Sequence, residues 1–153
     1  MKAASIMLQG LASALFSTLL VLTTLAVFSR YALNYSLVWA EELGRYLFVW
    51  IVCIGAAIAV RRGAHVSVDF LVATLPRRVQ AVLAFITELG ICLFLLVIIV
   101  YGAELTLFGW NSYSLAMGMP MALAYAALPF SGVIMLGFTV SRLVSQLKAL
   151  REI

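Results

Sequence analysis

Charged and metal-binding side chains are scarce in this chain of 153 residues, which has ten basic and six acidic residues, one histidine and two cysteines. With His65 as the single histidine, the chain cannot provide the two-histidine haem ligation of membrane cytochromes. Cys53 and Cys92 lack CxxC spacing, so neither a zinc site nor a disulfide-exchange centre is predicted. We therefore expect no metal and no cofactor in this chain.

Catalytic patterns are missing as well. The sequence has no glycine-rich phosphate loop and no nucleophile motif, and its acidic residues do not form a catalytic pair, although Glu88 and Glu104 fall in one apolar run. The net charge of +4 gives little support to nucleic-acid binding, because the basic residues gather at the ends of apolar runs. Neither catalytic nor substrate-binding residues are predicted, and an enzyme is not expected.

Apolar residues, by contrast, make up 65% of the chain. A helix needs about 20 apolar residues to cross a membrane, and four stretches qualify, at about residues 6–28, 46–60, 79–108 and 120–143. They are apolar throughout, which excludes the alternating strands of a β-barrel. The predicted fold class is all-α: a single membrane domain, residues 1–153, with four transmembrane helices and short interfacial amphipathic helices.

Two of these spans need comment. The stretch 46–60 is short, and it reaches the usual length only if Leu43 and Gly44 begin it. The stretch 6–28 follows Lys2 as a signal peptide would, but it exceeds the apolar region of a signal peptide and no small-residue cleavage site follows it. We interpret it as a retained helix.

Basic residues are distributed unequally between the two sides of the predicted membrane. One side holds only Arg30 and Arg45, and the connection 109–119 has no basic residue. Since basic residues accumulate on the cytoplasmic side, both termini are expected in the cytoplasm of a bacterial inner-membrane protein, with anionic lipid headgroups as partners. The residues assigned to the cytoplasmic side are Lys2, Arg61, Arg62, Arg77, Arg78, Arg142, Lys148 and Arg151.

The first connection predicts an interfacial helix at about residues 36–45. Glu41 and Arg45 are four residues apart and could form a helical ion pair. Glu41 and Glu42 also lie at the mouth of a span, where a partner helix could provide a base. An aromatic face, which a membrane-interface belt would explain equally well, comprises Tyr35, Trp39, Leu43, Tyr46 and Trp50.

The second connection predicts another amphipathic helix at about 66–75, because an isolated strand there would leave its backbone groups unpaired. Pro76 would end this helix and open the third span. Arg61 and Arg62 would serve either as topology determinants or in a specific contact that involves His65 or Asp69.

Glu88 lies about ten residues beyond Arg78, on the order of 15 Å into the bilayer. It could be a proton or substrate site, pair with a group on a neighbouring subunit, or be protonated or hydrogen-bonded inside the bundle. We expect no basic residue of this chain at its depth, which favours a partner protein over pairing within the chain.

Three sequence blocks together resemble the small membrane (Q-type, DctQ-like) subunit of TRAP, or tripartite ATP-independent periplasmic, transporters. The first is WAEELGRYLFVW at residues 39–50, similar to a W-x-E-E-x-x-R-Y/F stretch. The most specific is IGAAIAVRRGAHVSVDFL at 54–71, and the third is MGMPMALAYAALPFSG at 117–132, with Pro120, Tyr125 and Pro129. The resemblance covers most of the chain in the family's order.

The resemblance implies a stationary scaffold in a secondary transporter that imports organic anions. A large membrane subunit would hold the solute and the coupling ion, usually sodium, and move them in an elevator-like manner, while a periplasmic binding protein delivers the solute. Interface candidates for the large subunit are Trp39, Glu41, Glu42, Arg45, Arg61, Arg62, His65, Asp69 and Glu88. Close helix packing is expected at Gly55, Ala56, Ala57, Gly132 and Gly137.

Two other functions stay open at this point. A small dimeric exporter would need a central acid, a role that Glu88 would have to take because the stretch 6–28 has only Ser and Thr among polar residues after Gln9. A haem-free membrane anchor or assembly subunit of another complex would have a very similar sequence.

Overall fold

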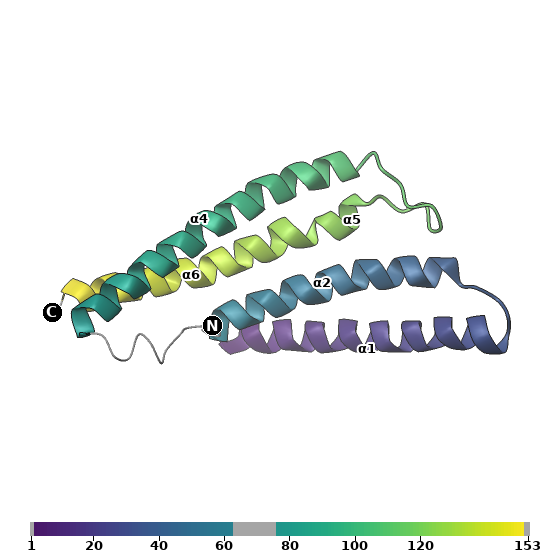
Figure 1. The fold of residues 1–153 in the computed structure, drawn as a ribbon, viewed down its shortest axis with the longest axis horizontal. Coiled ribbons are helices and arrows are strands. Elements are labelled where there is room, and N and C mark those ends of the chain that lie inside the picture. The colour runs from purple at the N-terminus through teal and green to yellow at the C-terminus, as the bar shows by residue number, and fades with distance from the viewer. Residues whose placement is uncertain (1, 63–75, 152–153) are drawn as a thin grey trace.

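The computed structural model describes residues 2–62 and 76–151. Its long helices are α1 (Lys2–Ala32), α2 (Val38–Arg62), α4 (Arg77–Gly109) and α6 (Ala127–Arg151), and the short α5 (Ala122–Tyr125) directly precedes α6 (Figure 1). In the described part, four helical segments are long and apolar enough to cross a membrane. The predicted all-α membrane class is confirmed.

The helices form two antiparallel hairpins, α1 with α2 and α4 with α6, which meet along α2 and α6 (Figure 1). Connections 33–37 and 110–121 lie at one end of the bundle, which we call the loop end. The start of α1 and the end of α6 lie at the other, which we call the terminal end (Figure 1). Helices α2 and α6 therefore run in the same direction, from the loop end to the terminal end.

Helix α2 differs from the expectation of an interfacial helix at 36–45 followed by a separate span at 46–60. It is one continuous helix, and its apolar part alone, Val38–Arg61, has 24 residues. The boundary expected near residue 45 is wrong because the backbone stays helical through the charged segment.

The other expected interfacial helix, 66–75, lies outside the described residues. Pro76 directly precedes α4, as expected, and its carbonyl accepts from the N–H groups of Val79 and Gln80 at 2.9 and 3.1 Å.

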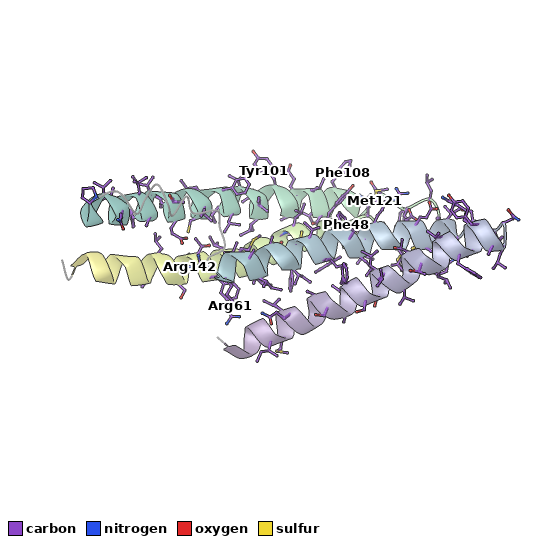
Figure 2. All side chains as sticks on the ribbon, turned by 60° about the horizontal axis from the view of Figure 1, so that its bottom comes forward. Phe48, Arg61, Tyr101, Phe108, Met121 and Arg142 are labelled. Atoms are coloured by element: carbon purple, nitrogen blue, oxygen red, sulfur yellow. The ribbon has the colours of Figure 1, made fainter. Side chains whose placement is uncertain are left out.

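The core between the hairpins is thin. Its buried cluster consists of Ala57 on α2, Leu95 on α4 and Met135 on α6, together with Val60. Most large apolar side chains instead face outward, among them Tyr101 and Phe108, which point away from the bundle in Figure 2. In the stretch 6–32 of α1 only Ser29 is buried. Lipid accepts such an apolar outer surface, which water would not.

Two glycines of α4 and one of α6 allow these helices to approach closely. A Cβ atom on Gly109 would lie 2.6 Å from Tyr125 Cδ2 and 2.9 Å from the backbone nitrogen of Ala122. A Cβ on Gly132 would lie 2.8 Å from Ile99 Cγ1, and one on Gly102 would lie 3.1 Å from Pro129 Cδ. The packing role expected for Gly132 is confirmed, whereas Gly55 and Gly137 have nothing within 4 Å of an added Cβ.

These contacts predict that Gly109→Ala destabilises the fold by about 1–3 kcal/mol, the usual cost of overpacking, because backbone as well as a ring blocks the added methyl group. Gly90→Ala, on the same helix but with open space around it, is the matched control and should leave stability unchanged or slightly higher. The midpoint of unfolding in mixed micelles, followed by tryptophan fluorescence, measures both. Equal midpoints for the two variants would contradict the close approach.

Candidate functional site

The candidate site is the loop end, where α2 begins with the charged segment that contains Glu41, Glu42 and Arg45. Glu41 lies in the first turn of α2, a position where the helix dipole favours a carboxylate. Asn34 adopts a positive φ of 51° in the preceding turn, a conformation that asparagine tolerates. Ser29 closes that turn, since its carbonyl accepts from the N–H groups of Leu33 and Tyr35 and its hydroxyl donates to the Tyr35 carbonyl at 2.7 Å. The start of α2 is therefore held firmly against the end of α1.

Glu41 forms an ion pair with Arg30 of α1. The guanidinium of Arg30 also donates to Ser36 Oγ at 3.1 Å. The pair expected between Glu41 and Arg45 is therefore wrong, because Arg30 reaches across the turn and takes the Glu41 carboxylate. Both partners are about half exposed, so the pair contributes at most about 1 kcal/mol.

Glu42 makes a different contact, with the far connection 110–121. Its Oε2 accepts from the backbone N–H groups of Ala116 at 3.0 Å and Met117 at 2.9 Å. Hydrogen bonds to a charged acceptor are about twice as strong as neutral ones. The carboxylate of Glu42 therefore joins the first hairpin to the loop of the second.

Connection 110–121 is itself ordered by backbone bonds. The N–H of Ser114 donates to the Met119 carbonyl at 2.9 Å, and the N–H of Met119 donates to Ser114 Oγ at 3.3 Å. The N–H of Met121 donates to the Ser112 carbonyl at 2.8 Å. Gly118 has a φ of 65°, which a side chain would strain. These bonds aim the N–H groups of Ala116 and Met117 at Glu42. Sequence reasoning missed this contact, although a connection without basic residues can offer a carboxylate only neutral donors.

Trp50 connects the hairpins two turns below Glu42. Its indole N–H donates to the carbonyl of Leu123 at 2.9 Å, and its ring lies 5.7 Å from that of Phe130. Pro129 lies in the first turn of α6, and its missing N–H leaves the Tyr125 carbonyl without its usual helical donor, next to the break between α5 and α6 at Ala126. The irregular backbone around Ala126 lets the Leu123 carbonyl accept from another helix.

The predicted aromatic face does not act as one unit. Tyr35 lies in the turn before α2, Trp39 is 43% exposed, and Tyr46 is half-buried with a hydroxyl that makes no hydrogen bond in the described structure. Trp50 alone among them bonds to the other hairpin.

Glu88 has a partner within the chain. Its Oε1 lies 3.4 Å from Nη1 of Arg142, and the two side chains are 12% and 27% exposed respectively. Figure 2 shows Arg142 between α4 and α6. The expectation that no basic residue of this chain reaches the depth of Glu88 is therefore wrong. Arg142, which the sequence assigned to the cytoplasmic end, lies on the neighbouring helix α6 and reaches Glu88 from there.

The described members of the second predicted group, Arg61 and Arg62, lie at the terminal end of α2. The guanidinium of Arg61 is 5.9 Å from the centre of the Phe138 ring, within cation–π range. Arg62 ends α2, and its side chain lies outside the described residues together with His65 and Asp69. Within residues 2–62 and 76–151, no three His, Cys, Asp or Glu side chains gather as metal ligands would.

A comparison with known protein families matches most of the chain. The family described as tripartite ATP-independent periplasmic transporters, DctQ component, matches residues 19–149. The chain belongs to this DctQ family. The Q-type resemblance seen in the sequence is thereby confirmed, and the exporter and anchor alternatives lose their support.

Curated relatives agree with this family. A Haemophilus influenzae chain that carries the name TRAP transporter small permease protein is 33% identical over 141 residues, 90% of this chain and 86% of that protein. The sialic acid TRAP transporter small permease protein SiaQ of Vibrio cholerae is 28% identical over 136 residues, 89% and 79% of the two chains. The C4-dicarboxylate TRAP transporter small permease protein DctQ of Rhodobacter capsulatus is 37% identical over 107 residues, 65% and 45%.

DctQ proteins are thus small permease subunits of TRAP systems, in which a small permease pairs with a large permease subunit. This chain is accordingly a multi-pass membrane component of a transporter.

The loop-end contact predicts that Glu42→Ala destabilises the protein by about 1–3 kcal/mol, because two backbone N–H groups lose their acceptor. Hydrogen exchange at Ala116 and Met117 should accelerate at the same time. Glu41→Ala is the matched control and should cost under about 1 kcal/mol without changing exchange in that connection. Unchanged exchange in Glu42→Ala would show that the carboxylate does not hold the connection.

The Glu88–Arg142 pair predicts coupling between two helices. Glu88→Gln and Arg142→Gln should each destabilise the bundle, and the double variant should be more stable than the sum of the single effects by about 0.5–3 kcal/mol. Glu104→Gln, on the exposed side of α4, is the control and should change little. Strict additivity of the two substitutions in unfolding measurements would exclude the pair.

Proposed function

We propose that this chain is the stationary small subunit of a TRAP transporter that imports organic anions, in particular carboxylates. A large permease subunit would hold the solute and the coupling ion, a periplasmic protein would deliver the solute, and a sodium gradient would drive import. The relatives named for sialic acid and C4-dicarboxylate support this solute class, since both are carboxylates. The chain itself would contribute no group to the solute or sodium site.

The proposal places both termini in the cytoplasm of the inner membrane. The charge distribution supports this orientation, because the end of the bundle with the termini carries most of the basic residues. The loop end, with Arg30 and Arg45, would then face the periplasm.

The observation that carries the scaffold role is that polar side chains of the described bundle are used to tie helices together. Glu42 bonds to connection 110–121, Trp50 bonds to Leu123, and Glu88 pairs with Arg142. Each contact joins elements distant in sequence and opposes their relative movement. A subunit that stays fixed while its partner moves needs this property.

For the interface with the large permease we propose the outer face of α2. Val52, Gly55 and Ala56 are exposed there at helical spacing, and an added Cβ on Gly55 meets nothing within 4 Å. Small residues let helices approach closely in membranes, where close packing drives association. Trp39 would extend this interface at the loop end. The second predicted group, Arg61, Arg62, His65 and Asp69, would extend it toward the terminal end.

Transport in reconstituted vesicles tests the function. Sialic acid and a C4-dicarboxylate serve as probes, with the large permease that co-purifies with this chain and the binding protein of the same system. We expect sodium-dependent uptake of an organic anion only when this chain accompanies both partners. Equal uptake without this chain would overturn its role in the transporter, and uptake independent of sodium would overturn the coupling ion.

Co-purification tests the proposed face of α2. Gly55→Leu should reduce recovery of the large permease by about tenfold, the effect of losing close packing worth about 1.4 kcal/mol. Gly90→Leu is the matched control, since Gly90 also has open space but lies on α4. The opposite result, with loss only in Gly90→Leu, would place the interface on α4 instead.

A further inference from the structure

A groove between α1 and α2 is not used by the proposed function. Its volume is about 750 Å³, and it is open toward the surroundings of the bundle. The walls are mainly apolar, with Leu19, Ala26 and Val27 on α1 and Gly44, Phe48 and Val49 on α2. The two helices are close at Gly44, since an added Cβ would be in ordinary contact with Leu19 Cδ1 at 3.5 Å.

Three charged residues line the same groove, namely Arg30, Glu41 and Arg45. Arg30 takes the carboxylate of Glu41, which leaves the groove with one excess positive charge. Arg45 is exposed and has no ion pair with any described residue. It lies seven residues beyond Val38, so about 10 Å along α2 from the helix start. An exposed cation beside apolar walls near this end of the span is complementary to an anionic partner.

The shape and charge of the groove indicate which partner fits. Its apolar walls follow α1 from Leu19 to Arg30, about 16 Å of helix axis, and its charged residues lie toward the loop end. An extended acyl chain matches the apolar walls, and a headgroup phosphate matches the charged end. The combination of a narrow apolar groove and an unpaired cation is therefore complementary to a lipid with an anionic headgroup.

We propose that this groove binds one anionic glycerophospholipid from the membrane leaflet at the loop end. One acyl chain lies between Ala26 and Phe48, and the phosphate contacts Arg45 with Arg30 beside it. The excess positive charge selects a headgroup of net negative charge over a zwitterionic one. Arg45, an interface candidate from the sequence, is thereby assigned to lipid and not to a helix of the large permease.

Native mass spectrometry of the chain, purified with its accompanying partners and delipidated in mild detergent, tests this site. Phosphatidylglycerol or phosphatidylethanolamine with identical acyl chains is added back, and bound lipid per chain is counted. We expect one tightly held phosphatidylglycerol, with retention about tenfold lower in Arg45→Gln, which removes the charge-assisted contact, and in Ala26→Phe, which fills the groove. Arg45→Lys should retain most of the lipid because it keeps the charge.

Matched controls are Lys148→Gln, a charge removed from α6, and Ala103→Phe, the same bulky change on an exposed position of α4. Both should bind lipid as the unchanged chain does, and an unchanged elution profile verifies folding of every variant. Equal retention of the two lipids, or full retention in Arg45→Gln, would overturn the proposal. Loss of the large permease in Arg45→Gln with an unchanged lipid count would also overturn it and would assign Arg45 to a protein contact.

Discussion

The absence of hydrogen-bond partners in lipid is the constraint on which the rest of this structure depends. Backbone groups satisfy it by forming helices, and hydroxyl side chains satisfy it within their own helix. Thr18, Thr24 and Thr139 donate to the carbonyls four residues earlier, at 2.9, 2.8 and 3.0 Å. These hydroxyl groups need no hydrogen-bond partner on a neighbouring helix. Helix α1 can therefore carry several of them although it packs mainly against α2.

Other polar groups cannot be satisfied within their own turn, and these make the contacts between helices. A carboxylate needs donors, an indole N–H needs an acceptor, and a proline leaves backbone carbonyls of the preceding turn without a donor. Glu42, Glu88 and Trp50 each find a partner on another segment for this reason. The polar contacts between helices in the described bundle therefore follow from side-chain chemistry and not from a surplus of polar residues.

The same distinction decides what could be predicted from the sequence. Hydropathy depends on local composition, and it placed the first, third and fourth spans within about four residues of the helical segments Ile6–Ala32, Val82–Gly109 and Ala122–Val144. The second span began too late because three charged residues were taken as its outer boundary, although they continue the helix from Val38.

Contacts between helices were beyond the sequence because they depend on the axial position of one helix against another. Arg142 was assigned to the cytoplasmic end, yet it reaches Glu88 from 54 residues away. Glu42 was predicted as a contact with the large subunit, whereas its acceptor role toward connection 110–121 depends on a fold of that connection that no local pattern indicated. The start of α6 had a local signal in Pro129, which lies in its first turn and was interpreted only as a family feature.

The positions of these contacts along α2 explain why the two hairpins behave as one unit. Glu42 contacts the second hairpin at the loop end, Trp50 contacts it two turns lower, Ala57 packs in the shared core, and Arg61 lies over Phe138 at the terminal end. From Glu42 to Arg61 these contacts span about 28 Å of the helix axis. A single contact would act as a pivot about which the hairpins could tilt, but contacts at several heights resist tilting as well as sliding. Because none of them requires a large apolar core, the outer surfaces of α1, α2 and α4 remain available to lipid and to a partner subunit.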